Sequence, residues 1–194
     1  CGYLDGGVIS ECSAKGSVDV YSSNPSAYAG GVCAVNEGGK VLRCRSEADV
    51  SSRGAQGSAA GGLAAKNKGL IKDSYSVGTV AASADGGKGN VYAGGLVACN
   101  FGSLGDGYAT GEVKGEKGET SASGTVCGAN YGSVENCYAA KAEGMGTLGY
   151  SPAATDTRAL ETGEFASLAE KLDSSLGVWK NGRNGYPVLA WQEA

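Results

Sequence analysis

The 194-residue chain contains no histidine. Histidine is the commonest general base and the commonest metal ligand among side chains, so its absence excludes Ser-His-Asp and Cys-His catalytic arrangements. The seven cysteines include no C-x-x-C pair, which leaves zinc and thioredoxin-like chemistry without support. We therefore expect a chain with no catalytic residue, no metal site and no cofactor.

A basic excess and long apolar runs are missing as well. Lys and Arg number 16 against 20 Asp and Glu, a net charge of −4, which disfavours nucleic acid and anionic membrane as partners. No apolar run reaches about 18 residues, so we expect no membrane insertion within this segment. No secretory signal is present, and the chain begins inside a repeat. We therefore expect a mature or excised part of a larger protein, with other domains of that protein as neighbours.

Glycine is abundant, with 35 residues of 194, and it recurs at fixed offsets. The stretches AGGLAAKNKGLIKDSYSVGTV (60–80) and AGGLVACNFGSLGDGYATGEV (93–113) are copies of one another. Further copies span 29–50 and 123–143, and a truncated copy opens the chain. The copies align on Asp5, Asn36, Asn67, Asn100 and Asn130. A period of about 30 residues is typical of units that bury apolar surface only by stacking on one another.

Within each copy, small or apolar residues alternate with varied, mostly polar ones. Two of the apolar columns are Ile9, Val41, Ile71, Leu104, Val134 and Cys12, Cys44, Ser74, Gly107, Cys137. A period of two indicates half-buried strands, and the glycine load excludes helix. We predict an all-β fold, a parallel β-solenoid (β-helix) of about five coils over residues 1–145. The asparagines should form a hydrogen-bonded ladder, with a corner at Gly7, Gly38, Gly69, Gly102 and Gly132.

The segments GGLAAKNKGLIKDSYSVGTV and GGLVACNFGSLGDGYATGEV resemble the GLUG motif, G-G-L-V-G-x-N-x-G-x-I-x-N-C-Y-S-x-G-x-V. This motif occurs in bacterial surface proteins, including filamentous-haemagglutinin-like adhesins and the non-catalytic region of immunoglobulin A1 protease-like proteins. The resemblance covers about residues 1–145 and departs from the pattern at Lys141 and Glu143. It implies an extracellular bacterial β-solenoid, either on the cell surface or secreted.

Residues 146–194 have a different composition and are predicted to be a capping segment. Four apolar residues stand at helical spacing, with Thr162 as the predicted N-cap: Phe165, Leu168, Ala169 and Leu172. The stretch GVWKNGRNGYPVLAWQ then predicts a short β-hairpin around an Asn-Gly turn. Because an open solenoid end exposes core, we expect this segment to cover that end; the alternative is that its tryptophans form a sugar platform.

Cys12 and Cys44 occupy one column of adjacent coils, at a Cα spacing of about 4.8 Å that is compatible with a disulfide. Cys137, however, faces Gly107, and the number of cysteines is odd. Buried thiols acting as small hydrophobic residues explain the pattern more simply. We therefore expect Cys12 and Cys44 to be reduced.

Two surface features are candidate binding sites. The first is an outward column of Tyr75, Tyr108 and Tyr138, extended by Arg45, which could stack on sugars or dock protein. Its alternative is tyrosine stacking that only stabilises the sheet. The second is a set of inserts at the same place in each coil, at 21–28, 51–59, 81–92 and 114–122, where variable loops commonly bind.

These features predict a non-catalytic module for cell-surface adhesion, or a rigid spacer, with a host glycan or extracellular protein as the partner. The alternative is a carbohydrate-active β-helix enzyme, a polysaccharide lyase or glycosidase, whose site requires clustered carboxylates. One outward column carries charge: Glu11, Arg43, Asp73 and Asp106. The first three alternate in sign, so an exposed charge ladder is the simpler interpretation.

Overall fold

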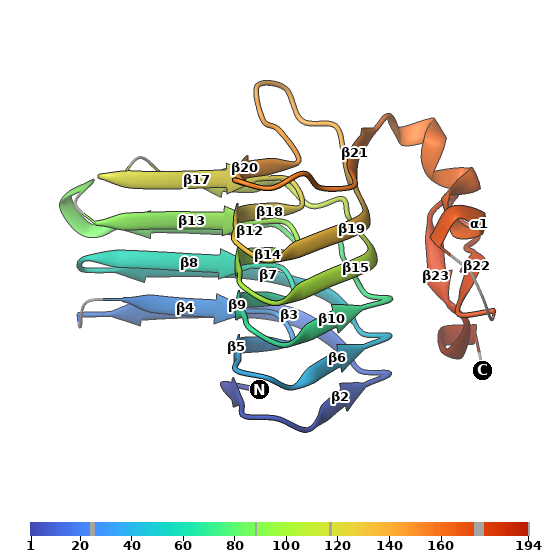
Figure 1. The fold of residues 1–194 in the computed structure, drawn as a ribbon, viewed down its shortest axis with the longest axis horizontal. Helices are drawn as coiled ribbons and strands as arrows, with labels where there is room; N and C mark the ends of the chain where they lie inside the picture. The colour runs from blue at the N-terminus through green and yellow to red at the C-terminus, as the bar shows by residue number, and fades with distance from the viewer. Residues whose placement is uncertain (24–25, 88, 117, 173–176, 194) are drawn as a thin grey trace.

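The computed structural model describes residues 1–23, 26–87, 89–116, 118–172 and 177–193. The chain winds into a parallel β-solenoid, followed by a short helix and a C-terminal β-hairpin (Figure 1). The predicted all-β solenoid is confirmed, but with about four turns rather than five. One of its sheets has four strands and another has six, because the first and last windings are only partial.

Three parallel sheets form the sides of the coil. The first sheet contains β1 (Tyr3–Leu4), β5 (Cys33–Asn36), β9 (Ala64–Asn67), β14 (Val97–Asn100), β18 (Cys127–Asn130) and β20 (Leu148–Tyr150). The second contains β2 (Val8–Ser10), β3 (Ser13–Ser22), β6 (Lys40–Leu42), β7 (Arg45–Gly54), β10 (Leu70–Lys72), β11 (Tyr75–Ser76), β12 (Val80–Ala84), β15 (Ser103–Ala109), β16 (Val113–Gly115), β19 (Ser133–Ala140) and β21 (Thr157–Leu160). The third contains β4 (Ala27–Gly30), β8 (Gly57–Gly61), β13 (Asn90–Gly94) and β17 (Thr120–Gly124).

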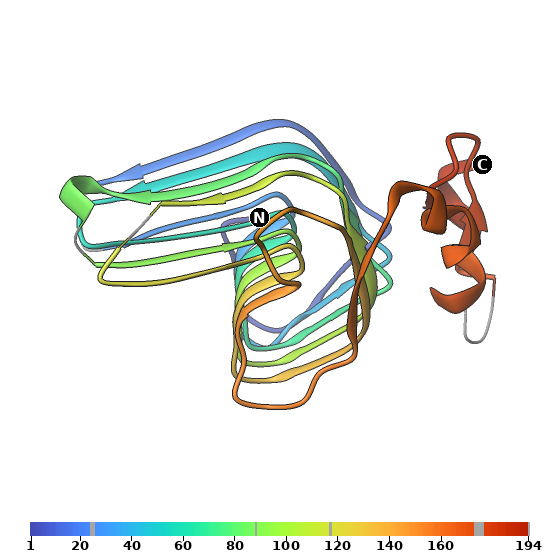
Figure 2. The same cartoon turned by 90° about the horizontal axis from the view of Figure 1, so that it is seen from above.

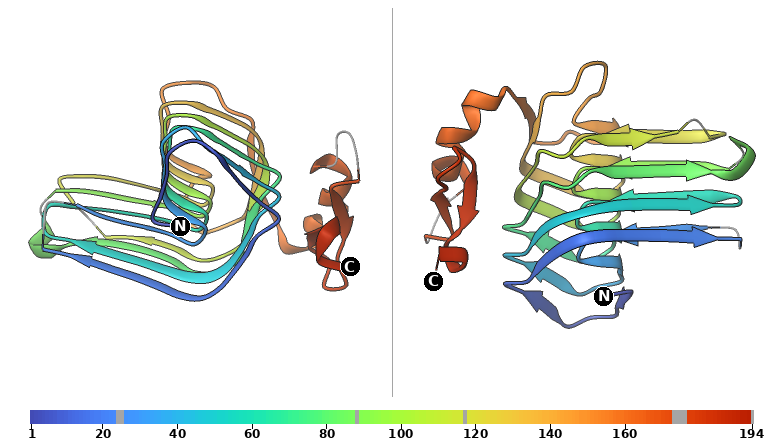
Figure 3. Two further views of the ribbon diagram at one scale, coloured as in Figure 1. Left: turned by 90° about the horizontal axis from the view of Figure 1, so that it is seen from below. Right: turned by 180° about the vertical axis from the view of Figure 1, so that it is seen from behind.

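Seen along the stack, each full coil has a body and a projecting arm (Figure 2; Figure 3, left). In the arm, the sheet of β4, β8, β13 and β17 faces β12, β16 and the ends of β3 and β7. Val50, Val80, Val91 and Val113 fill the space between these layers, together with small alanines. The predicted variable inserts are therefore mostly strands of this arm, because they too alternate small apolar and polar residues. A short 3₁₀ turn, Asp85–Gly87, lies at one tip.

The predicted register is confirmed in the body. Ile71 pairs with Val41 on one side and with Leu104 on the other. The asparagine ladder forms as expected, with the Nδ2 of Asn36, Asn67 and Asn100 each donating a hydrogen bond of 2.8 Å to the Oδ1 of the asparagine in the next coil.

The first coil departs from the predicted alignment. Leu4, not Asp5, pairs with Asn36, because the first two coils carry one more residue than the later ones at the corner that follows. Gly39, not Gly38, consequently lies beside Gly69 in the glycine column. The Leu4 side chain has no N–H group to donate to the asparagine ladder. The buried Oδ1 of Asn36 therefore has no hydrogen-bond partner among the described residues.

A left-handed turn recurs once per coil at positions without glycine. These positions have φ between 49° and 53°: Glu11, Arg43, Asp73, Asp106 and Asn136. Asn and Asp are the residues other than glycine that accept this conformation best. In the inner coils the residue after the turn is buried in the core; Cys44 and Cys137 are both fully buried.

The parallel ladder continues beyond the predicted boundary at residue 145. Strand β20 pairs with β18, and β21 pairs with β19 as far as Leu160. A 3₁₀ helix (Thr162–Ser167) follows and leads into α1 (Leu168–Leu172). The helical segment is capped by Glu161 rather than the predicted Thr162: Glu161 is extended, and its N–H donates to the Glu164 carboxylate at 2.8 Å.

The chain ends in the predicted antiparallel hairpin of β22 (Trp179–Asn181) and β23 (Pro187–Leu189), followed by a 3₁₀ turn (Ala190–Glu193). The apolar face of the helical segment is buried as predicted, at Phe165, Leu168, Ala169 and Leu172. None of the helices in the described part of the chain is long and apolar enough to cross a membrane.

Candidate functional site

The predicted tyrosine column exists. Tyr75 pairs in register with Arg45 on one side and Tyr108 on the other, and Tyr138 follows in the next coil. The Tyr75 and Tyr108 rings stack with centroids 4.9 Å apart and planes 5° apart. The column is not exposed, however, since Tyr75 is 4% and Tyr108 1% accessible to solvent.

The C-terminal segment covers these rings. Trp179 packs against both tyrosines, at centroid distances of 6.0 and 5.8 Å, and the Tyr108 hydroxyl donates a 2.6 Å hydrogen bond to the carbonyl oxygen of Pro187. Burial raises the pKa of Tyr108 well above its usual value. The prediction of an exposed binding platform is therefore wrong for Tyr75 and Tyr108, whose rings seat the C-terminal segment.

The remaining members of the column are also engaged within the molecule. The Tyr138 hydroxyl donates to Asn136 Oδ1 at 2.8 Å, and Arg45 contacts Ser13 and Glu47, each at 2.8 Å. The alternative of a tryptophan sugar platform fails for Trp179, which is 4% accessible. Cross-coil stacking, the other interpretation of this column, is what the structure contains.

The position of the C-terminal segment also differs from the prediction. It lies along the flank of the stack, on the side away from the arm, and not over an open end (Figure 1; Figure 3, right). Trp191 anchors the segment to the second coil through a 2.9 Å hydrogen bond from Nε1 to the Arg43 carbonyl oxygen. On this flank the segment packs its apolar residues against the rings of Tyr75 and Tyr108.

A different aromatic group is exposed on the body. Phe101 and Tyr131 stack with centroids 4.9 Å apart and planes 11° apart, and Tyr150 lies 5.6 Å from Tyr131. These three residues, here called the aromatic ladder, are 47%, 50% and 49% exposed. The Nζ of Lys66 lies 5.6 Å from the Phe101 centroid. Exposed aromatic groups of this kind commonly mark contact surfaces.

The backbone holds the aromatic ladder rigidly. Phe101 and Tyr131 directly follow ladder asparagines, and their amide N–H groups donate at 2.7 Å to the carbonyl oxygens of Asn67 and Asn100 in the preceding coils. The sequence signal was present, since Phe101 and Tyr131 share one column of the alignment. It was missed because the same column holds the charged pair Glu37 and Lys68 in the earlier copies.

The charged column does not gather the carboxylates of an enzyme site. Arg43 pairs with Glu11 at 2.9 Å, and Asp106 contacts Lys72 at 3.2 Å and Asn136 at 2.6 Å. Within the described ranges, no group of three or more His, Cys, Asp or Glu side chains could hold a metal ion. Asp73 is half-buried, and burial raises its pKa above the usual value.

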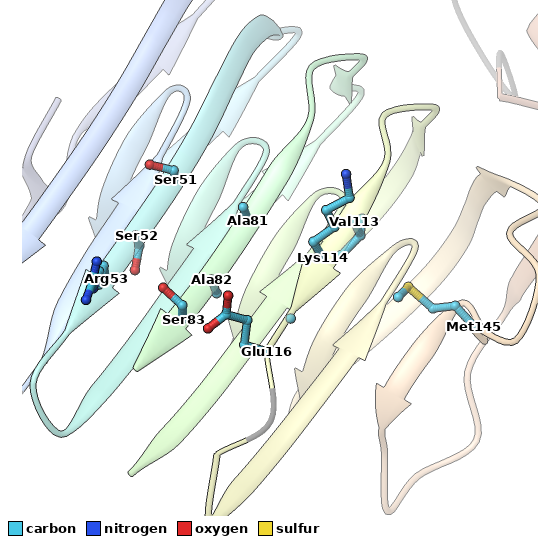
Figure 4. A pocket seen from close by; sticks show the side chains of 11 residues that line it. Ser51, Ser52, Arg53, Ala81, Ala82, Ser83, Val113, Lys114, Glu116 and Met145 are labelled. Carbon is cyan, nitrogen blue, oxygen red and sulfur yellow. The ribbon is translucent and has the colours of Figure 1, made fainter. Parts of the chain in front are cut away.

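The outer face of the arm has a hollow of about 520 Å³, shown in Figure 4. Residues of β7, β12 and β16 line it, together with Met145. These three strands are neighbours in the order β16-β12-β7, with β16 at the end of that order. Two of the hollow's charged lining residues are in ion pairs: Arg53 pairs with Asp85, and Lys114 pairs with Glu112 at 2.8 Å. The remaining lining is mostly small serine and alanine side chains, so the hollow has few groups to orient a ligand.

No protein-family model and no curated protein matches the sequence. Among solved structures, the chain is similar to the crystal structure of a protein from Bacteroides ovatus described as a "putative immunoglobulin A1 protease", with 26% sequence identity and a TM-score of 0.65. The similarity covers 98% of this chain and 62% of that chain, so the chain spans less than two thirds of its structural neighbour. The solenoid with its flanking C-terminal segment is thus an architecture that this chain shares with part of a protein bearing that description.

Proposed function

We propose that the chain is a non-catalytic, GLUG-type module of a bacterial protein that is secreted or held at the cell surface, where it binds a host protein or glycan through the aromatic ladder. The observation that carries the proposal is that Phe101, Tyr131 and Tyr150 are exposed and also lie in contact with one another, as one cluster of three rings. Large rigid rings with little side-chain entropy to lose are effective contact residues.

The geometry of the aromatic ladder indicates how it makes contact. Phe101 and Tyr131 stack face to face, so they offer ring edges and the Tyr131 hydroxyl outward rather than two open ring faces. Ring edges and hydroxyls suit a protein surface or the polar rim of a glycan. The stacked asparagines and parallel sheets make the module stiff, so the same chain also serves as a spacer that holds this surface away from its attachment point.

The structural neighbour supplies a first probe. Its description names immunoglobulin A1, and a non-catalytic region of such a protein would position the substrate rather than cleave it. The chain should therefore be tested for binding to immobilised immunoglobulin A1 and to a mammalian glycan array. In parallel, prolonged incubation with immunoglobulin A1 and with acidic polysaccharides tests the enzyme alternative, and we expect no cleavage.

The binding test compares the wild type with Phe101→Ala/Tyr131→Ala, and with Tyr21→Ala as the matched control because Tyr21 is 68% exposed on another face. We expect the double variant to bind about tenfold or more weakly and the control to bind as the wild type does. Equal binding by the double variant would remove the aromatic ladder from the site. Failure of the wild type to bind either probe would leave the spacer role alone.

A further inference from the structure

The cysteines of the first two coils are matched in register, although the later ones are not. The Cys1 N–H donates to Val32 O, and the Ala34 N–H donates to Cys1 O, both at 2.9 Å, which places Cys1 level with Cys33. Ser13 pairs with Arg45, which likewise places Cys12 level with Cys44. In the later coils, Cys127 faces Val97 and Cys137 faces Gly107.

Cys12 and Cys44 have the geometry of a cross-linkable pair. Residues level with one another in adjacent parallel strands project on the same face, with Cα atoms about 4.8 Å apart, inside the range that disulfides span. The Cys44 thiol reaches the first coil, where its Sγ donates to the Ile9 carbonyl oxygen at 3.7 Å. Both residues are free thiols in the structure, with Cys12 exposed and Cys44 buried.

The first coil is the place where such a link has most effect. Its strands β1, β2 and β3 each pair with one neighbour, in the second coil. Ile9, Val18 and Val20 are only partly covered there. An end coil with a single partner is the part of a stack that opens at the lowest free energy.

We propose that Cys12 and Cys44 form a disulfide clip that closes on mild oxidation and ties the exposed first coil to the second. A low-molecular-weight disulfide such as oxidised glutathione is the oxidant. The Cys12 thiolate attacks one glutathione sulfur and releases one glutathione thiolate. The Cys44 thiolate then attacks Cys12 Sγ and releases the second. The first glutathione thiolate leaves with the electron pair of the glutathione S–S bond, and the second leaves with the pair of the mixed-disulfide bond. The two protons of the protein thiols end on the two glutathione thiolates, so two electrons pass from the protein to glutathione disulfide.

The environment sets the rates of both directions. Cys12 is accessible and starts the reaction, whereas burial raises the pKa of Cys44 to about 11 and keeps its thiolate scarce. Closure is therefore slow. Reopening is also slow, because a reductant reaches Cys12 Sγ only and must expel a thiolate of high pKa.

The test incubates the folded protein in a glutathione redox buffer, alkylates the remaining thiols under denaturing conditions and maps the peptides by mass spectrometry. We expect a Cys12–Cys44 linked peptide and two fewer alkylated thiols than in the reduced protein. Amide hydrogen exchange over residues 1–22 should slow at least about tenfold in the oxidised form, since opening the first coil then requires a second coil to open with it.

Matched variants make the result specific. Cys12→Ser should abolish both the linked peptide and the added protection, whereas Cys137→Ser, which faces a glycine, should retain them. The proposal is overturned if Cys12 stops at a glutathione adduct, if it links to another cysteine, or if both thiols stay alkylatable after oxidation. It is also overturned if the amide hydrogens of residues 1–22 exchange as fast in the linked protein as in the reduced one.

Discussion

The hydroxyl of Tyr108 donates a hydrogen bond of 2.6 Å to the carbonyl oxygen of Pro187, 79 residues further along the chain. The bond is buried, and it joins the central coils to the C-terminal hairpin. A tyrosine that the repeat places on the outside of the sheet is thereby made interior by a segment outside the repeat.

Replacing Tyr108 by Phe removes this bond but keeps the ring. The Pro187 carbonyl then remains buried without its donor, so the free energy of unfolding should fall by about 1–3 kcal/mol. Urea unfolding followed by tryptophan fluorescence measures the change, because Trp179 lies against the ring. Tyr21→Phe is the control, since Tyr21 is exposed, and it should leave stability unchanged. A neutral Tyr108→Phe would mean that this hydrogen bond contributes nothing to holding the C-terminal segment.

The asparagine ladder should be sensitive to a single interruption. Asn67 Nδ2 donates to Asn100 Oδ1 at 2.8 Å and to the Ser103 carbonyl oxygen at 3.1 Å, while its Oδ1 accepts from Asn36. Asn67→Ala leaves buried groups unpaired on both sides and should lower the free energy of unfolding by about 3 kcal/mol or more.

Thermal unfolding of Asn67→Ala alongside Asn184→Ala tests this prediction. Asn184 is exposed in the hairpin turn, so its replacement should have little effect. Similar melting temperatures for the two variants would show that the ladder contributes no more than an ordinary surface amide.

The glycine corner offers a pair of substitutions three residues apart. A Cβ at Gly102 would lie 2.1 Å from the Gly69 carbonyl oxygen, whereas a Cβ at Gly105 meets its nearest atom at 3.7 Å. Gly102→Ala therefore has to push two coils apart and should cost about 3 kcal/mol or more, or prevent folding. Gly105→Ala should fold and melt close to the wild type. Soluble expression and circular dichroism melts of both variants check this, and equal behaviour would contradict the close stacking at Gly102.

The half-buried Asp73 should make stability depend on pH. Burial raises the pKa of its carboxyl, so the folded protein keeps the proton to a higher pH than the unfolded chain. The free energy of unfolding consequently falls as the pH rises from about 4 through the folded pKa. Asp73→Asn removes that loss and suits the left-handed turn, so it should be more stable than the wild type at neutral pH and lose the advantage near about pH 3.

Asp49 provides a control of opposite sign. Hydrogen bonds from the Thr79 side chain and backbone lower the pKa of its carboxyl. Its contribution is present above the unfolded pKa and disappears as the pH falls through the folded one. Asp49→Asn should therefore be less stable than the wild type at neutral pH. Melting temperatures measured from about pH 3 to pH 8 separate the two variants, and shifts of the same sign in both would contradict the assignments.

Much of the solenoid was predictable because it depends on two periods. The two-residue alternation sets which side chains face the core, and the 30-residue repeat sets which residues become neighbours, as Ile71 with Val41 and Leu104 shows. The first coil was misaligned because one additional residue at a glycine corner leaves the alternation intact on both sides. The strands of the arm are not predictable in the same way, because its short alanine and serine runs have too little apolar contrast to distinguish strand from loop.

The candidate site was less predictable. The sequence brought Tyr75 and Tyr108 together in one column, and the pairing is correct, but it contained no sign that Trp179 and Pro187 would cover them. Phe101 and Tyr131 were hidden among charged residues of the same column, so the ladder was recognised only from their exposure and contact.

The amino-acid sequence by itself determined the stacking, since a residue repeated at a constant interval meets its own copies whatever the rest of the chain does. The tertiary structure alone decided which outward faces stay exposed. A helical period shows that the C-terminal segment has an apolar face, but hydrophobic attraction has no direction. Where that face docks depends on shape and area that exist only once the coils are wound. It packs on Tyr75 and Tyr108 and leaves the aromatic ladder exposed to solvent.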